Sequence, residues 1–259
     1  MSTFLPFFAI IFGTFALAAI GTLMVRQLVY AHVAEGHNAV IVPIFQTAGT
    51  IYAVFLAFLV VAVWEAYDAA HANVAEEASA LATLYRASAG METASGAELR
   101  RLIRAYTRAV IQDEWRVQSQ SGGTSVEARA AALGMYRVFQ NLGADVRASD
   151  SAIDGAVLAI LGQILADRNK RTLEAGDALP PIMWVAAVGI GGIVVVMSFF
   201  LYMERRWPHT LSCAVMASVI AMLLCITFVL SRPFVGPMAL GPEPFQHSLE
   251  VFDSVDATP

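Results

Sequence analysis

Three acidic side chains and a phenylalanine share one side of a segment that begins apolar and becomes charged. A helix that advances about 100° per residue places Glu65 and Glu76 within about 20° of Phe58, and Asp68 within about 80°. If several copies of the chain surround an axis with this side inward, Phe58 forms a hydrophobic constriction and the acids form rings that concentrate cations. The same spacing fits an ordinary amphipathic helix whose acidic side faces water, and both interpretations stay open.

The other residue types that carry chemistry form weaker patterns. Arg100, Arg104 and Arg108 recur every fourth residue, so they need acidic partners nearby or bind a phosphate or lipid headgroup. His32 and His37 lack the i, i+4 helical spacing of zinc proteases, and we expect no metal there. The sequence contains no nucleophile elbow, phosphate-binding loop or paired-cysteine motif, so it predicts neither an enzyme nor a cofactor.

The composition indicates that the elements positioning these residues lie in a membrane. Of the 259 residues, 58% are hydrophobic and 14% are charged, whereas soluble domains carry about 25% charged residues. The net charge of −5 provides no basic face for nucleic acid, so a soluble, disordered or nucleic-acid-binding protein is excluded. Four segments without Asp, Glu, Lys or Arg are long enough to span a bilayer, namely 4–25, 39–64, 182–203 and 211–231.

The sequence therefore predicts an all-α integral membrane protein with four transmembrane helices and a helical extramembrane domain inserted between the second and third. With four spans, the N-terminus, the helical domain and the tail share one side, which we expect to be the cytoplasm although flanking positive residues are nearly balanced. The expected parts are a first transmembrane hairpin (1–64), the helical domain (65–181), a second transmembrane hairpin (182–231) and a Pro/Gly-rich tail (232–259).

The second span is expected to continue out of the membrane as one helix, because neither proline nor glycine occurs between Gly49 and Ala89. Further helices are predicted over 99–110, 126–142 and 149–173, with a loop at 119–124. Small residues allow helices to pack closely, and we expect this of three glycines in the third span. They are Gly189, Gly191 and Gly192.

Three stretches carry a family resemblance. The first is residues 51–68, IYAVFLAFLVVAVWEAYD, which includes Trp64; the second is Arg168–Arg171. The third is RPFVGP at 232–237, with Pro233, Phe234 and Gly236. Together they resemble the bestrophin-like domain family of uncharacterised, mainly bacterial membrane proteins.

A more distant resemblance is to the bestrophins, pentameric ion channels whose second span lines the pore with phenylalanines. It implies a homo-pentamer here, with Phe55 and Phe58 in the pore-lining span. Bestrophins follow a Pro-Phe-Gly after their last span with an acidic run that clasps calcium. Here Val235 separates Phe234 from Gly236 and no acidic run follows, so calcium gating is not implied.

The spans contain no ionisable residue for a proton relay, which argues against a coupled carrier, whereas a channel with an apolar gate needs none. We predict an oligomeric ion channel of the bacterial inner membrane, cation-preferring or weakly selective. Its expected partners are the lipid bilayer, further copies of the chain and inorganic ions. The alternative is a non-conducting membrane scaffold or sensor that presents its helical domain to protein partners.

Overall fold

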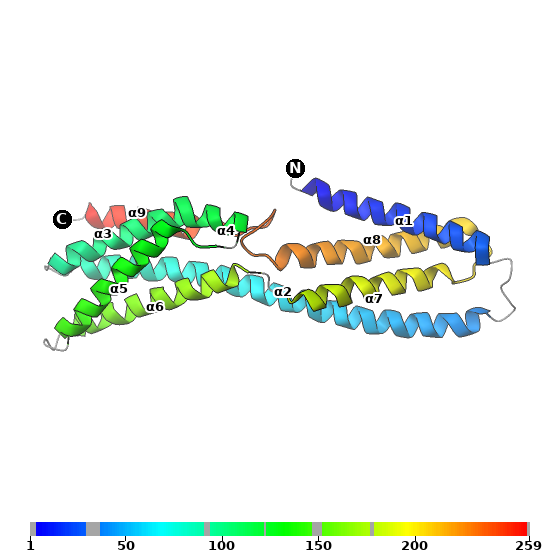
Figure 1. Ribbon diagram of the computed structural model, residues 1–259, viewed down its shortest axis with the longest axis horizontal. Coiled ribbons are helices and arrows are strands. Elements are labelled where there is room, and N and C mark those ends of the chain that lie inside the picture. Colours follow the sequence, from blue (N-terminus) through cyan, green and yellow to red (C-terminus); the bar gives the residue numbers. More distant parts are fainter. Residues whose placement is uncertain are drawn as a thin grey trace. The chain divides into compact units, whose positions relative to one another are not determined.

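The computed structural model describes residues 4–29, 37–90, 94–121, 123–146, 152–176 and 179–257, and within them the regular elements are helical (Figure 1). One of them, η3, is a single π-helical turn that continues α3. The elements are α1 (Leu5–Val29), α2 (His37–Ala89), α3 (Ala94–Ala109), η3 (Val110–Glu114), α4 (Trp115–Ser121), α5 (Val126–Val146), α6 (Ala152–Glu174), α7 (Pro181–Phe199), α8 (Arg206–Leu230) and α9 (Glu243–Asp256).

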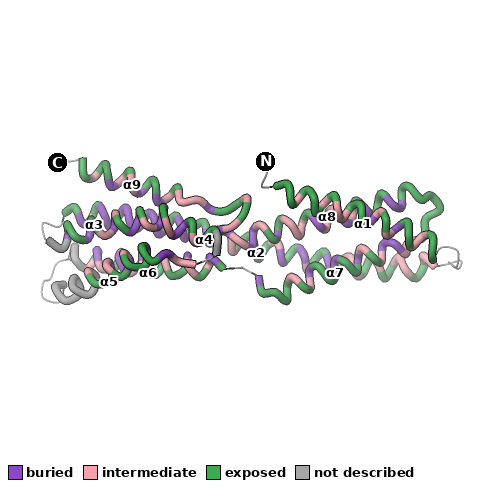
Figure 2. The backbone as a smooth tube through the Cα atoms, turned by 45° about the horizontal axis from the view of Figure 1, so that its top comes forward, coloured by how far each residue is buried: buried purple, intermediate pink, exposed green. Residues whose placement is uncertain are grey.

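The chain folds as two units, and the first comprises Met1–Glu65 and Ala178–Ser231. It holds α1, α7, α8 and the first part of α2, and these helices are long and apolar enough to cross a membrane. Figure 2 shows them covered mainly by exposed residues, with few buried positions. Such an extent of exposed apolar surface is what a bilayer covers, so this unit is the membrane part of the protein.

Polar contacts tie the α7–α8 connection to the ends of α1 and α2 within this first unit. The Asn38 side chain donates to the Tyr202 carbonyl at 2.8 Å and accepts from the Tyr202 N–H at 2.9 Å. Arg26 donates to the carbonyls of Met203 and Glu204 at 2.8 and 2.7 Å. These bonds give hydrogen-bond partners to backbone groups that follow the end of α7.

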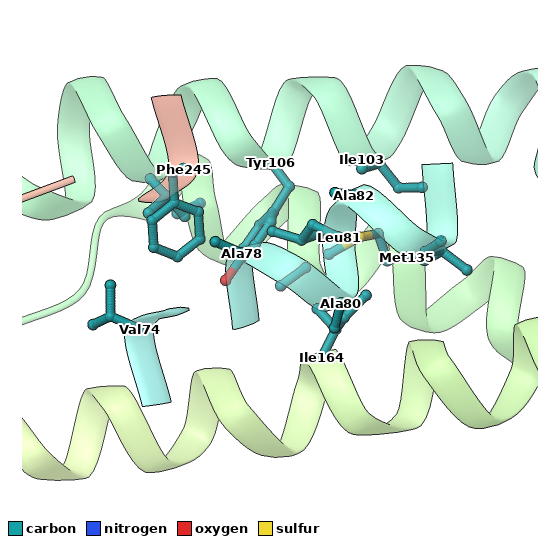
Figure 3. Packing of buried hydrophobic residues seen from close by; sticks show 14 of the residues in the cluster. Val74, Ala78, Ala80, Leu81, Ala82, Ile103, Tyr106, Met135, Ile164 and Phe245 are labelled. Atoms are coloured by element: carbon teal, nitrogen blue, oxygen red, sulfur yellow. The ribbon is translucent and has the colours of Figure 1, made fainter. Parts of the chain in front are cut away.

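Helix α2 is continuous over 53 residues, as the absence of breaking residues after Gly49 predicts. Its later part belongs to the second unit, which comprises Ala66–Asp177 and Arg232–Pro259. The core of that unit surrounds α2 with α3, α5, α6 and α9 (Figure 3). It includes Val74, Leu81, Ile103, Met135, Ile164 and Phe245, all at most 1% exposed.

Two local features differ from the sequence-based expectations. Ser119 to Ser121 belong to α4 rather than to a loop, and the next helix begins after Ser125, whose hydroxyl accepts from the Ala128 N–H at 2.9 Å. The C-terminal segment contains a helix, α9, that the proline and glycine content concealed. Phe245 and Phe252 lie two turns apart on it and are both fully buried, which explains its docking.

Candidate functional site

The candidate constriction residues lie on the exposed side of α2 in the membrane unit. Phe58 is 72% exposed and Phe55 is partly buried. On the other side of the same stretch, Tyr52, Leu59 and Val63 are at most 5% exposed, because they pack within the unit. Phe58 therefore has no packing role inside one copy of the chain.

The three acidic candidates, Glu65, Asp68 and Glu76, are also exposed. Within the described residues none of them forms an ion pair. Beside Glu76, within the second unit, Ser79, Thr83 and Gln163 line a surface hollow of about 390 Å³. Ala75, Ala80 and Ile160 also line this hollow, so the surface beside Glu76 is a mixture of polar and apolar residues.

The neighbouring glutamate has the opposite environment. Glu77 is completely buried, and its carboxylate accepts from Arg171 Nε at 2.7 Å and from the Tyr106 hydroxyl at 2.5 Å. Successive helix residues point about 100° apart, so turning Glu77 into the core directs Glu76 outward. Two consecutive acids on α2 thus have separate roles, one in packing and one on the surface.

Arg171 is the centre of this buried network and is also completely buried. Besides Glu77 it donates to Glu114 Oε1 at 3.1 Å and to Gln118 Oε1 at 3.1 Å. Its guanidinium lies 5.6 Å from the ring centre of Trp115, close enough for a cation–π contact. One side chain of α6 therefore joins α2, η3 and α4.

The charges in the network are mutually supporting. Burial lowers the pKa of the Arg171 guanidinium, but Glu77, Tyr106 and Glu114 together outweigh this effect, and the pKa lies above its ordinary value. Burial raises the pKa of the Tyr106 hydroxyl most, and the negative charge of Glu77 raises it further. The hydroxyl therefore stays neutral and donates its hydrogen to the Glu77 carboxylate. Arg168 completes the charge balance by pairing with Glu114 at 3.2 Å. The network is a structural anchor, because its charges are matched and sealed from water.

The resemblance residues after the last span form a turn. Gly236 has a φ of +100°, which favours glycine, and the Leu240 N–H donates to the Pro233 carbonyl at 2.8 Å. Phe234 is 2% exposed and contacts Trp115 edge-to-face. The motif therefore directs the chain back onto the second unit. Trp64, the other resemblance residue, is 56% exposed in the membrane unit.

The three glycines of α7 differ in what surrounds them. A methyl group on Gly191 would lie 2.5 Å from the Tyr52 hydroxyl, whereas one on Gly189 or Gly192 would meet nothing within 4 Å. Gly191 thus serves close packing inside the chain. Gly189 and Gly192 leave open space, and Gly192 lines an apolar hollow with residues of α1 and α8.

The arginine stripe of α3 finds partners both in the tail and in the helical domain. Arg104 forms ion pairs with Asp253 and Asp256 of α9, and Arg100 donates to the Ser88 carbonyl. Burial alone lowers the pKa of Arg104, but its hydrogen bond to Asp253 helps raise the pKa above the ordinary value. Within the stripe, Arg104 therefore has a structural role in holding α9.

No metal-binding group of three His, Cys, Asp or Glu occurs in the part of the chain that the structure describes. His37 instead contacts the Phe200 carbonyl at 3.0 Å, and His32 lies outside the described residues. The sequence analysis did not predict the Arg171 network. The available signal was the Arg168–Arg171 stretch, in which two arginines occur beside an apolar helix face.

Comparison with known proteins places this arrangement in a family. The sequence pattern of the bestrophin-like domain matches residues 3–245. A comparison with curated proteins finds no match. A bestrophin homologue from Klebsiella pneumoniae is 13% identical, with a TM-score of 0.70 over 96% of this chain and 100% of that chain.

A single-substitution variant of a Klebsiella pneumoniae bestrophin homologue gives a TM-score of 0.71 at 12% identity, over 98% of each chain. Identity this low shows a shared fold alone. The family pattern, however, covers nearly the whole sequence and includes all three resemblance stretches up to Phe245. The chain belongs to the bestrophin-like domain family.

Proposed function

We propose that this membrane protein is an oligomeric ion channel whose pore is lined by α2. The observation that carries the proposal is the exposure of Phe58, Glu65, Asp68 and Glu76 along the side of α2 that its own chain leaves uncovered. Packing within a single copy does not account for this combination, because all four side chains are exposed. Around a symmetry axis it supplies an apolar constriction followed by charged rings. The bestrophin resemblance favours five copies.

The charge of the rings favours cations. Repetition in every subunit makes each acidic position a ring of like charge, which concentrates cations and repels anions near the pore mouth. Phe58 and Phe55 restrict the pathway without offering a charge of their own. The channel is therefore cation-preferring or weakly selective.

Assembly requires contacts between copies, and the open space beside Gly189 and Gly192 offers a close-approach surface for them. Native mass spectrometry in a mild detergent is expected to show a single closed oligomer, and substitution of both glycines by leucine to weaken it. Monomers alone would contradict the proposal. The exposed side of α2, with Phe58, Glu65, Asp68 and Glu76, would then fit a non-conducting scaffold that presents its helical domain to protein partners.

The membrane arrangement belongs to the proposal. Residues 65–181 and 232–259 lie with the N-terminus in the bacterial cytoplasm, and residues 1–64 and 182–231 form the two transmembrane hairpins. Single cysteines at Arg205 and Thr124, in a chain with Cys213 and Cys225 replaced, distinguish the two sides. An impermeant thiol reagent outside the cell is expected to label position 205 and not position 124.

The functional test is the reversal potential of purified protein in planar bilayers under a KCl gradient. We expect the wild-type potential to lie on the cation side and Glu65→Gln/Asp68→Asn to move it toward the anion side. Glu250→Gln is the matched control, because that carboxylate is exposed on α9 with its side chain 76% accessible. A potential that the double variant leaves unmoved would place the acidic side outside the pore, and a protein that never conducts would favour the scaffold.

A further inference from the structure

Tyr52 and Gly191 are in contact in the membrane unit through the hydroxyl oxygen of Tyr52. The Tyr52 hydroxyl donates to the Ala187 carbonyl of α7 at 3.2 Å, and the residue is 3% exposed. The site where a methyl group would stand on Gly191 is 2.5 Å from that hydroxyl oxygen and 3.4 Å from Ile220 Cγ2 of α8. The hydroxyl therefore occupies space that only glycine leaves open. We call this contact the Tyr52 seat.

The Tyr52 seat differs in kind from the other contacts of the same stretch of α2. Leu56, Leu59 and Val63 are buried on the same side at spacings of four, three and four residues, and their contacts are apolar. Apolar burial is non-directional and tolerates a small rotation of the helix, whereas a hydrogen bond in a fitted space does not. Among the buried residues from 52 to 63, the seat is therefore the contact that specifies the rotation of α2 beside Phe58.

The position of Phe58 follows from this rotation. Phe58 comes six residues after Tyr52 and points about 120° away from it around the helix. Fixing Tyr52 against α7 thus directs Phe58 away from its own unit, where it is 72% exposed. We infer that Tyr52 and Gly191 are positioning residues that set the rotation of α2 and so aim Phe58 along the proposed pore. The inference rests on the proposed function.

Three variants separate the parts of the seat. Gly191→Ala places a methyl group against the Tyr52 hydroxyl, and Tyr52→Phe removes the hydroxyl and leaves the space empty. In the double variant Tyr52→Phe/Gly191→Ala the nearest Tyr52 ring carbon lies 3.0 Å from the added methyl, so a shift of a few tenths of an ångström suffices. Gly13→Ala is the matched control, because a methyl on Gly13 of α1 meets nothing within 4 Å.

The readout is spin-label accessibility along α2, measured in liposomes with full-length protein lacking Cys213 and Cys225. Nitroxides are placed one at a time at residues 57 to 62, and collisions are recorded with oxygen, which enriches in lipid, and with a nickel chelate, which stays in water. The accessibility maximum reports the rotation of the helix whether its exposed side meets lipid or water. Single-channel conductance is recorded without labels for the three seat variants and for Gly13→Ala.

We expect the accessibility maximum at position 58 in the wild type and in Gly13→Ala. The maximum should be displaced in Gly191→Ala and return to position 58 in the double variant. Conductance should change in Gly191→Ala and be restored in the double variant. A maximum that Gly191→Ala leaves in place, or that the double variant fails to restore, would overturn the inference. A maximum at 58 that is accessible to oxygen and not to nickel would overturn the proposed pore instead, and the displacement would still decide the role of the seat.

Discussion

The two parts of α2 are held by opposite kinds of contact. In the membrane unit the helix is fixed by neutral contacts: Tyr52 donates to a backbone carbonyl beside a glycine, Asn38 bonds to the backbone of Tyr202, and buried side chains make apolar contacts. In the second unit it is fixed by a buried ion network, in which Glu77 binds Arg171 at 2.7 Å. The same helix therefore uses neutral packing at one end and matched charges at the other.

The neutral contacts of the first unit fit its membrane surroundings. A charge buried within a bilayer has no nearby water to relax around it, so membrane helices pack through small residues and backbone hydrogen bonds. The second unit buries Glu77, Glu114 and Arg171 together, and their mutual ion pairs offset the cost of removing these charges from water. In both units the anchored side of α2 leaves an uncovered side, and the proposed pore residues lie there.

The largest expected effect comes from breaking the charged anchor. Arg171→Met leaves Glu77 and Glu114 buried without their main partner, which we expect to lower the free energy of unfolding by about 3–5 kcal/mol. Thermal and urea unfolding in detergent provide the measurement. Arg116→Met is the control, because the Arg116 side chain is 69% exposed, and a change beyond about 0.5 kcal/mol there is not expected. Equal decreases in the free energy of unfolding for the two variants would show that Arg171 does not stabilise the second unit more than an exposed arginine does.

A matched pair of Tyr→Phe substitutions compares the two anchors directly. Tyr106→Phe removes a hydroxyl that donates to the buried carboxylate of Glu77, and a bond to a charged group is worth about 1.5–3 kcal/mol. Tyr52→Phe removes a neutral bond inside the membrane unit, where such bonds average about 0.6 kcal/mol. Unfolding of both variants under one set of detergent conditions should rank them in this order. The reverse order would contradict the contrast between the units.

The smallest expected effect is a change in pH dependence in the second unit. Burial raises the pKa of Asp167, Lys170 lowers it, and Glu76 and Glu77 raise it, with a net increase. A carboxyl with a raised pKa binds more protons folded than unfolded, so stability falls as pH increases from the ordinary Asp range through the raised value.

Asp167→Asn cannot ionise, so it should flatten this slope and add about 0.5 kcal/mol of stability at neutral pH. Asp167 Oδ2 has no hydrogen-bond partner in the described structure, so the substitution removes no bond there. Asp113→Asn on η3 serves as control, since that side chain is 35% exposed and pairs weakly with Arg116 at 3.9 Å. An unchanged slope in Asp167→Asn would assign the pH dependence to another group.

The fold could be predicted from the sequence to the extent that it depends on local patterns. The length of the four apolar segments predicted four helices long enough to span a membrane. The absence of proline and glycine between Gly49 and Ala89 predicted the long helix α2. Helix α9 could not be recognised, because its two buried phenylalanines lie among prolines and polar residues. The Arg171 network also depends on tertiary contacts, since Glu77, Glu114 and Arg171 are distant in sequence and only packing brings them together.

The proposed site likewise has a part that local sequence patterns predict and a part that depends on tertiary contacts. Helical spacing placed Phe58, Glu65 and Glu76 on one side of α2, and all three are exposed, whereas Val74, Leu81 and Tyr85 of the same helix are buried. Spacing alone grouped Gly189, Gly191 and Gly192, whereas the structure assigns only Gly191 to a contact within the chain. A glycine's neighbour lies on another helix, and no pattern within α7 identifies it.

The most direct test of the account is block of the current by a thiol reagent at Phe58. In full-length protein lacking Cys213 and Cys225, a single cysteine replaces Phe58 of α2 or, as control, Ile193 of α7. Both positions are exposed in one chain, at 72% and 59%. If α2 lines the pore, a positively charged, water-soluble methanethiosulfonate should reduce the current in planar bilayers for the variant at 58 and leave the variant at 193 unchanged. Block at 193 without block at 58 would contradict the account, and so would the absence of any current from the unmodified oligomer.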